Sequence, residues 1–326
     1  MACELRLSKE KFIYPYYMKF TRAILILTFA AMAFANSFVN DFLTMDSDIR
    51  SSAMGGCPFV ARGASGVFNN PATVGTGDFL FFGHEQRYNG LLISDAAGIE
   101  LNISSPGDFA VGVLYTGGSG INTTELPDPS APISATNRPY STGEESHHDL
   151  VLMPAYAMQF GDLRIGASAG FLFRDLVDIR GYGGSASIGA DWNAARNLHL
   201  GAVISRISYI SWGTGTSEFG MPSLEAGGSY GFDIGAGFAA TLCAGGSYSL
   251  QEELMEGSAG LELAYRDLFS LRGGISDRHF TAGADLRIID GFCAGAALSI
   301  QEDLPISYRI GLSMTRRGDS ALDPTE

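Results

Sequence analysis

Residues 163–174, Leu-Arg-Ile-Gly-Ala-Ser-Ala-Gly-Phe-Leu-Phe-Arg, alternate between apolar side chains and small or polar ones. The apolar set is Leu163, Ile165, Ala167, Ala169, Phe171 and Phe173, and the other face carries Arg164, Gly166, Ser168, Gly170 and Arg174. Successive side chains of a β-strand point to opposite faces of the sheet, so a period of two predicts a strand with one apolar and one polar face. No helical period of 3.6 residues competes with it.

The same alternation recurs along most of the chain after residue 78 and predicts about fourteen strands of roughly ten residues each. The predicted spans are 78–86, 96–104, 108–116, 148–159, 163–174, 182–192, 197–206, 222–231, 236–248, 257–266, 268–275, 278–287, 293–300 and 306–314. About ten residues is the length that a tilted strand needs to cross a bilayer. An apolar face against lipid and a polar face toward a lumen is the arrangement of membrane barrels.

The connections between the predicted strands also alternate in length. Tight links are expected at 160–162, 193–196, 231–233 and 289–292, and longer connections at 117–147, 175–181, 207–221 and 249–256. Aromatic residues cluster at the ends with tight links, as in an inner aromatic girdle: Phe160, Trp192, Phe232, Phe269 and Phe292. A soluble β-sandwich would alternate as well, but strand length and turn asymmetry favour an all-β, transmembrane antiparallel barrel.

The N-terminal region has the layout of an export signal. Lys19 and Arg22 precede an apolar run from Ala23 to Ala35, and Ala33-Phe34-Ala35 forms a cleavage site before Asn36. These three parts predict a signal peptide at 18–35, with 1–17 as an over-extended gene start. A buried N-terminal helix or an uncleaved anchor is the alternative.

Composition excludes some classes of partner. The whole chain has 21 basic and 35 acidic residues, and removal of residues 1–35 leaves a net charge of about −17. Nucleic acid is therefore not an expected partner, because phosphate binding needs clustered Lys and Arg. Glycine, at 42 of 326 residues, suits closely packed barrel walls. Cys57, Cys243 and Cys293 are far apart in sequence, and buried free thiols are favoured over a disulfide between the last two, which lie on non-adjacent predicted strands.

No catalytic arrangement is evident, so an enzyme is not expected. His147 ends the long polar connection 117–147, and His148 follows it directly. Solvated side chains are a simpler interpretation of this pair than a metal site. The glycine-rich runs lack the strand-to-helix context of a phosphate loop. We therefore expect no cofactor and no metal.

One segment before the first strand does not alternate. It contains Ser51-Ser-Ala-Met-Gly-Gly-Cys-Pro-Phe-Val-Ala61 and then Phe68-Asn-Asn-Pro-Ala72. These motifs resemble the N-terminal signature of the FadL-like outer-membrane barrels, a group that includes the PorV proteins. Cys57-Pro58 departs from the usual single small residue. The closing strands also resemble this family, except that the chain continues past Met314 into a polar tail.

The resemblance implies that this region folds into the lumen as a hatch. Its site residues would be Asn70, Pro71 and Ala72 in the hatch, with Gly55 and Gly56 packed against the wall. Pro71 restrains its own backbone and keeps Asn70 out of the helical region, while the Asn side chain can bond nearby backbone groups. A surface turn before the first strand is the alternative.

With the resemblance included, the expected organisation has five parts. These are a gene start at 1–17, a signal peptide at 18–35, a hatch segment at 36–77, a β-barrel at 78–314 and a polar tail at 315–326. The implied function is FadL-like passage of hydrophobic small molecules across the outer membrane of a Gram-negative-type bacterium, with lipid and a hydrophobic ligand as partners. The alternative is a PorV-like partner that receives secreted cargo from a secretion complex, and a soluble periplasmic β protein is a weaker third option.

Overall fold

The computed structural model describes residues 41–44, 47–103, 106–266, 268–277, 279–302 and 304–316. The predicted gene start and signal peptide, and the tail from residue 317, lie outside the described residues. Six short helical segments occur in the described chain: η1 (Asp41–Thr44), α2 (Ile49–Ala53), η2 (Pro58–Val60), η3 (Ala64–Val67), η4 (Pro71–Thr73) and η5 (Tyr88–Gly90). No helix in these ranges is long and apolar enough to cross a membrane.

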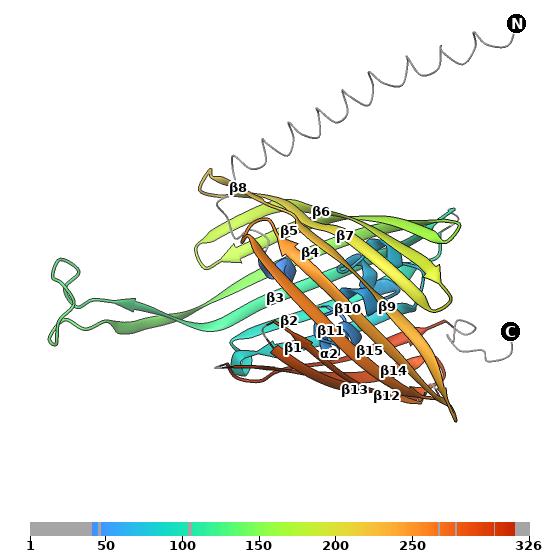
Figure 1. The fold of residues 1–326 in the computed structure, drawn as a ribbon. Coiled ribbons are helices and arrows are strands. Elements are labelled where there is room, and N and C mark those ends of the chain that lie inside the picture. The colour runs from blue at the N-terminus through green and yellow to red at the C-terminus, as the bar shows by residue number, and fades with distance from the viewer. Residues whose placement is uncertain are drawn as a thin grey trace, which may run out of the picture.

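The rest of the described chain is dominated by β-strands (Figure 1). They are β1 (Asp78–Arg87), β2 (Leu92–Leu101), β3 (Asp108–Glu125), β4 (Tyr140–Phe160), β5 (Leu163–Leu176), β6 (Ile179–Ala195), β7 (Leu198–Trp212), β8 (Ser217–Gly220), β9 (Ser223–Gly235), β10 (Phe238–Ser249), β11 (Leu254–Tyr265), β12 (Phe269–Ser276), β13 (His279–Ile289), β14 (Phe292–Gln301) and β15 (Ser307–Thr315). All fourteen predicted strands are present, and β8 lies in the predicted connection 207–221.

The sheet closes into a barrel. Each strand pairs antiparallel with its neighbours, and β1 pairs with both β2 and β15. The four-residue strand β8 pairs with the C-terminal part of β7, whereas β9 pairs with the N-terminal part of β7. β8 therefore extends the wall at one end and is not counted among the fourteen barrel strands. Closure leaves no free edge along the wall, which is the condition for a sheet to span lipid.

The apolar face of the wall points outward, as predicted. Ile165 and Phe171 are 44% and 67% exposed, whereas Ser168 between them is 5% exposed. Four of the five aromatic residues expected at the tight turns are also exposed, with Phe160 at 55% and Trp192 at 49%, whereas Phe292 is half-buried. We call the end with these turns the short-turn end, and the opposite end the long-loop end; β1 begins and β15 ends at the short-turn end, where Asp78 pairs with Thr315.

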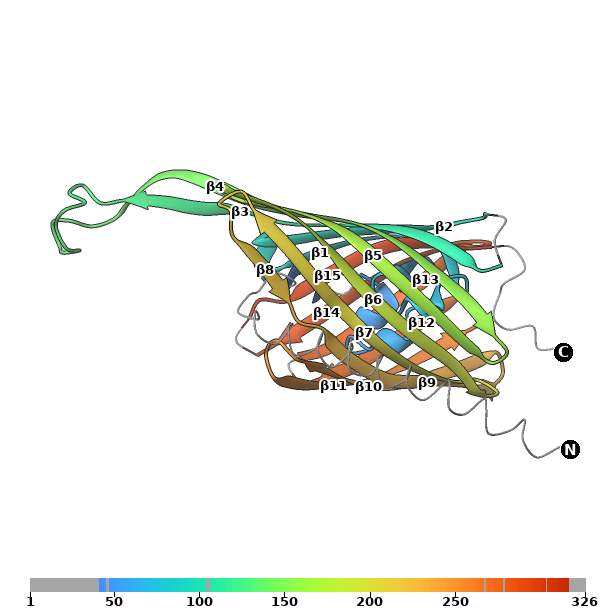
Figure 2. The same cartoon turned by 90° about the horizontal axis from the view of Figure 1, so that it is seen from above.

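The expected long loop at 117–147 is wrong. The strand β3 continues to Glu125 and β4 begins at Tyr140, so His147 and His148 lie within a strand. At the long-loop end, β3 extends past its last pair with β2, and β4 extends past its last pair with β5. There β3 and β4 pair only with each other and form a two-stranded ribbon that projects past the barrel (Figures 1 and 2). Both faces of this ribbon are exposed, so no apolar alternation marks it in the sequence. The connection at 175–181 is likewise only a tight turn, because β5 and β6 extend to Leu176 and Ile179.

Candidate functional site

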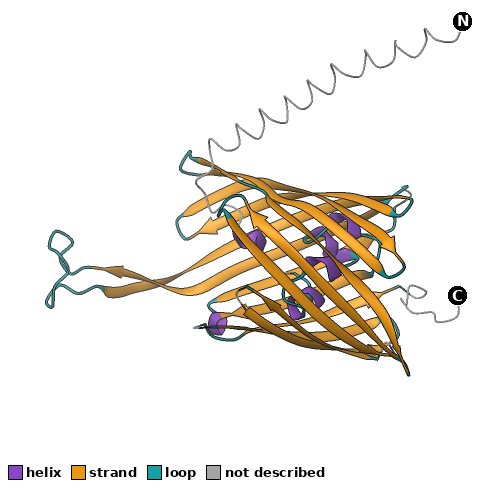
Figure 3. Ribbon diagram, in the orientation of Figure 1, coloured by secondary structure: helices purple, strands orange, loops and turns teal. Residues whose placement is uncertain are grey.

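A chain segment fills the interior of the barrel. We call residues 47–77 the plug; Figure 3 shows its short helices enclosed by the strands. The plug touches opposite sides of the wall, with α2 against β12 to β15, η2 against β7, β9 and β10, and η4 against β4 to β6. Its apolar side chains are almost fully buried, including Met54 at 0%, Val60 at 2% and Val67 at 1% exposure.

The plug is built from turns that cap themselves. The carboxylate of Asp48 accepts a hydrogen bond from the Ser51 amide at 2.8 Å and begins α2. At η4, Asn70 Oδ1 accepts from the Ala72 amide at 3.1 Å, and Pro71 occupies the first position, where its missing N–H costs nothing. Short turns of this kind satisfy buried backbone groups without a long helix.

Glycines in the wall leave room for the plug. On twelve of the fourteen barrel strands, a glycine is placed so that an added Cβ would come within 3.3 Å of a plug atom. We call this set the glycine belt: Gly98, Gly112, Gly166, Gly189, Gly201, Gly227, Gly245, Gly260, Gly274, Gly283, Gly295 and Gly311. Several belt glycines are direct cross-strand partners, such as Gly260 with Gly274, so the belt forms a nearly continuous ring. The ring allows plug and wall to approach closely.

Two plug glycines have different geometries. Gly55 has a φ of +79°, and a Cβ there would lie 2.6 Å from the Ile275 carbonyl oxygen. Its amide donates to Thr281 Oγ1 at 2.8 Å, and Thr281 Oγ1 donates to the Ala53 carbonyl at 3.0 Å. A Cβ on Gly56 would meet no atom within 4 Å, so only its φ of +73° favours glycine there.

Both cations of the plug are paired with carboxylates of the wall. Arg50 donates to Glu262 of β11, with Nη2 to Oε1 at 2.6 Å and Nε to Oε2 at 2.9 Å. Glu262 also accepts from Arg272 of β12 at 2.5 Å, and its side chain is 7% exposed. Arg272 contacts Asp285 on its other side, so one buried network joins the plug to three strands.

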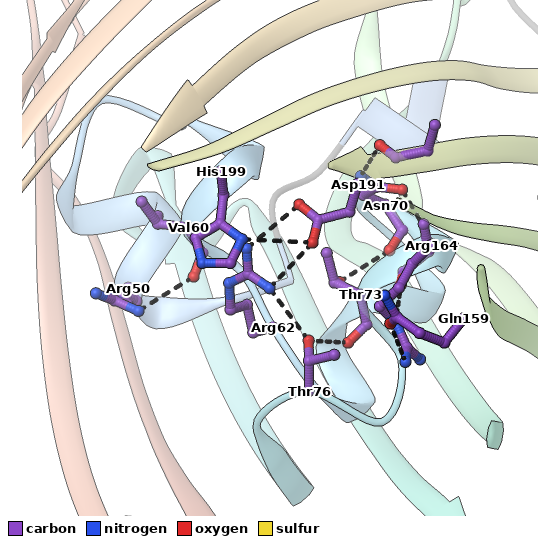
Figure 4. A network of polar contacts seen from close by, with 12 residues as sticks. Arg50, Val60, Arg62, Asn70, Thr73, Thr76, Gln159, Arg164, Asp191 and His199 are labelled. Carbon is purple, nitrogen blue, oxygen red and sulfur yellow. Dashed lines mark hydrogen bonds and ion pairs between the residues drawn. The ribbon is translucent and has the colours of Figure 1, made fainter. Parts of the chain in front are cut away.

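The second cation, Arg62, forms a two-pronged contact with Asp191 of β6, in which both nitrogen-to-oxygen distances are 3.3 Å (Figure 4). Its guanidinium also donates to Thr76 Oγ1 within the plug at 3.3 Å. Asp191 is 6% exposed, and His199 Nδ1 lies 3.7 Å from its Oδ2 atom. Burial lowers the pKa of Arg62, and the ion pair with Asp191 opposes that shift.

A wall arginine completes the set. Arg164 of β5 donates to the Ala72 carbonyl at 2.9 Å and also to the Val74 carbonyl, both in the plug. It forms an ion pair with Asp108 of β3 at 2.8 Å. The plug is therefore bound to the wall by ionic or charge-assisted contacts at three places around the ring.

Asn70 of the Asn-Pro-Ala motif, by contrast, makes a neutral contact. Its Nδ2 donates to the Ala190 carbonyl of β6 at 3.0 Å, and it is 1% exposed. Asn70 thus bonds the wall through one end of its amide and caps η4 through the other. Pro71 packs on Gly166, and Ala72 is fully buried between the capped turn and Arg164.

We expect Glu262→Ala to loosen the plug, because it leaves Arg50 and Arg272 without their shared carboxylate. Removing one partner of a buried ion pair costs about 3–5 kcal/mol. The measurement is ion conductance of the purified barrel in planar bilayers, which should rise. The control is Asp175→Ala, which removes the partner of Arg180, a wall arginine whose side chain is 68% exposed. Equal conductance of Glu262→Ala and wild type would contradict the tethering role.

The lumen differs on the two sides of the plug. Toward the short-turn end lies a cavity of about 1160 Å³ lined by both polar and apolar groups, including Arg62, Asp162 and Arg196. Toward the long-loop end, side chains from η1, from η3 of the plug and from β1 to β5 form an apolar cluster of buried residues. We call it the apolar cluster; its members are Phe42, Ala64, Phe81, Ala96, Leu114, Val151, Met153 and Leu172.

Polar groups border the apolar cluster. Arg174 lies over the Phe42 ring at 4.7 Å and pairs with Asp149 at 2.8 Å. Ser185 and Ser208 face each other across β6 and β7, and their hydroxyls have no hydrogen-bond partner in the described chain. Buried hydroxyls without partners are uncommon.

Known structures share this architecture, although neither a protein-family model nor a curated protein matches the chain. The toluene transporter TodX of Pseudomonas putida is similar at a TM-score of 0.54 and 14% identity, over 83% of this chain and 98% of that one. The toluene transporter TbuX of Ralstonia pickettii is similar at a TM-score of 0.53 and 14% identity, over 82% and 98%. The monoaromatic hydrocarbon channel CymD gives 0.52 and 13%, over 83% and 97%.

The chain has the FadL-like outer-membrane barrel fold. This confirms the fold class expected from the alternating strands and from the resemblance at residues 51–72. The structural similarity covers 98% of each of the two toluene transporters and is therefore not limited to their barrel strands. None of the three named structures is a secretion partner, so the PorV-like alternative gains no support from them.

Several contacts of the plug were missed from the sequence. Arg50 and Arg62 are the only cations among residues 47–77. If this segment is buried in the barrel, each of them needs a carboxylate partner on the wall, and the sequence offered that clue. Their partners, Glu262 and Asp191, occupy inward positions of alternating strands, but the sequence does not say which inward acid meets which plug arginine. In the described residues, no cluster of three or more His, Cys, Asp or Glu side chains is placed to hold a metal ion.

Proposed function

We propose that this protein is an outer-membrane channel that binds and passes hydrophobic small molecules, with the plug acting as its hatch. The observation that carries the proposal is the apolar cluster between the plug and the long-loop end. Leu114, Val151 and Met153 are buried and packed together in this cluster. An apolar molecule that inserts among them gains about 25 cal/mol per Å² of surface that it buries. The named toluene transporters and hydrocarbon channel, which share the fold, point to the same class of compound.

The proposed path starts at the long-loop end and leads to the apolar cluster, where the plug blocks further movement. Passage then requires the plug to shift from the wall, and the molecule leaves through the polar cavity of about 1160 Å³ toward the short-turn end. Asn70, Pro71 and Ala72 hold the closed position through the contacts with Ala190, Gly166 and Arg164. A loss of any of these contacts lowers the free energy needed for opening.

The test is uptake of radiolabelled toluene by a Gram-negative host that expresses the protein, compared with the empty vector. We expect faster toluene uptake and no change for glycerol, a polar solute. Met153→Gln, a change of similar volume that places an amide in the apolar cluster, should slow toluene uptake several-fold, since a buried amide without partners costs about 1–3 kcal/mol.

The matched control is Met158→Gln on the same strand. Met153 is 6% exposed and inward, whereas Met158 is half-buried on the outer face, five residues away. Toluene uptake equal to that of the empty vector would refute the proposed function. A rate lowered equally by both variants would refute the role of the apolar cluster.

A further inference from the structure

Two cysteines that are far apart in sequence meet at the interface of plug and wall. Cys57 belongs to the plug and Cys243 to β10, and they are 0% and 5% exposed. Both pack with Met54, Phe59 and Val60 in a second group of buried residues, which is separate from the apolar cluster. The Cys243 thiol lies 3.9 Å from the carbonyl oxygen of Met54, three residues before Cys57. Neither cysteine is in a disulfide in the structure.

The neighbouring contacts fix this meeting point. Two residues after Cys57, the Phe59 ring sits in a slot formed by Gly201, Gly227 and Gly245 of the glycine belt. Gly245 is two residues from Cys243 on the same inward face of β10, so the seated ring places Cys57 beside Cys243. A shift of the plug that withdraws Phe59 from its slot also separates the two sulfurs.

We propose that Cys57 and Cys243 form a redox site that, when oxidised, ties the plug covalently to the wall. The oxidant is a disulfide of a small molecule or protein in the oxidising compartment that adjoins the outer membrane. One cysteine thiolate attacks that disulfide and releases the first thiol; the second cysteine thiolate then attacks the mixed disulfide and releases the second. The balance is two protein thiols plus one external disulfide, giving one Cys57–Cys243 bond and two external thiols.

The tie would act on the opening step. Reduced protein can move the plug after breaking non-covalent contacts alone, whereas oxidised protein cannot withdraw residue 57 from the wall. The bond itself does not depend on what the channel carries; its effect on passage rests on the proposed function. Cys293 lies on β14, half-buried at the polar cavity, and serves as the internal reference thiol.

The first experiment detects the bond. In one arm, purified full-length protein is exposed to oxidised glutathione in detergent while it is folded; in a second arm, it is refolded in the presence of the same reagent. The remaining thiols are then alkylated, and peptides are identified by mass spectrometry without reductant. We expect a Cys57–Cys243 linked peptide in Cys293→Ser as in wild type, and none in Cys57→Ser or Cys243→Ser. Absence of this peptide from both arms, or preferential pairing with Cys293, overturns the proposal.

The second experiment measures the consequence in liposomes that contain the Cys293→Ser protein. Toluene entry should fall by roughly tenfold or more after oxidation and recover with dithiothreitol, in line with the several kcal/mol that a disulfide contributes. Cys57→Ser should show no response to either reagent. A linked protein with unchanged entry overturns control of passage. Lack of entry in both redox states, with the linked peptide present, refutes the transport function and leaves the redox site standing.

Discussion

Gly274→Val is expected to force the plug out of its seat while leaving the barrel closed. A Cβ at residue 274 would lie 2.2 Å from the Gly55 nitrogen and 2.3 Å from the Met54 carbonyl carbon, both backbone atoms. These atoms cannot turn aside as a flexible side chain does, so the α2 end of the plug must move. Overpacking of this kind costs about 1–3 kcal/mol or more, and each ~1.4 kcal/mol changes a population tenfold.

The displaced plug also loses the hydrogen bond from the Gly55 amide to Thr281. We therefore expect ion conductance in planar bilayers to rise by roughly ten- to a hundredfold, as the plugged state loses about 1–3 kcal/mol. Heat-modifiable migration on a denaturing gel should remain, since the backbone pairing of β12 with β11 and β13 does not involve the side chain of residue 274. A valine favours strands, which supports the wall itself.

The adjacent residue provides the control. Gly273 is on the opposite face of β12, and a Cβ there would lie 3.9 Å from its nearest neighbour, the Thr281 carbonyl oxygen. Gly273→Val should behave as wild type in both assays. If Gly274→Val and Gly273→Val conduct equally, the plug does not occlude the lumen through this contact.

The strands were predictable because lipid and lumen impose opposite demands on alternate residues. In β5, Ile165 and Phe171 face outward and Ser168 faces inward, and the sequence displays that contrast directly. Leu172 shows the limit of this rule, since it is apolar, 3% exposed and inward. An inward apolar residue belongs to the apolar cluster, and alternation alone cannot separate it from a residue that faces lipid.

The plug contacts could not be derived from alternation. Belt glycines such as Gly189 and Gly274 are far apart in sequence and resemble any strand glycine until the plug is laid against them. The pairing of Cys57 with Cys243 depends in the same way on the path of the plug. Predicting such contacts needs the position of one element inside another, which no local propensity encodes.

The ribbon of β3 and β4 was missed for a different reason. Its strands, from Ile121 to Glu125 and from Tyr140 to Glu145, have no buried face, so polar residues occupy both sides. The tip instead depends on Asn137, whose Nδ2 lies within 3.3 Å of the Asp128, Ala131 and Pro132 carbonyl oxygens. Side-chain bonding of a loop to its own backbone gives order without a hydrophobic pattern.

The distribution of contacts suggests how the plug could open. Its α2 end is held by steric fit in the glycine belt and by the Arg50 network, whereas the η4 end is held by backbone carbonyls, Arg164 and the amide of Asn70. The Asn70 hydrogen bond is neutral and contributes about 0.5–1.5 kcal/mol, and the charge-assisted bonds of Arg164 contribute about 1.5–3 kcal/mol each. Each is less than the roughly 3–5 kcal/mol that breaking a buried ion pair costs. The η4 end is therefore the part that we expect to move first.

Asn70→Ala tests that order of movement. The change removes the contact with the Ala190 carbonyl and the cap on the Ala72 amide, and both buried groups are left without these partners. The cost is about 1–3 kcal/mol for the buried Ala72 amide that loses its acceptor. We expect altered toluene uptake, with a faster rate because opening becomes easier, and a barrel that still shows heat-modifiable migration.

Asn70→Ser separates the two roles of the side chain. Serine is also a good N-cap and can bond the Ala72 amide, but it is too short to replace the amide that reaches Ala190. If the contact with the wall governs opening, Asn70→Ser should speed uptake nearly as much as Asn70→Ala; if the local turn governs it, serine should behave as wild type. Unchanged uptake in both variants would rule out Asn70 as part of the gate, even if toluene passes through the barrel.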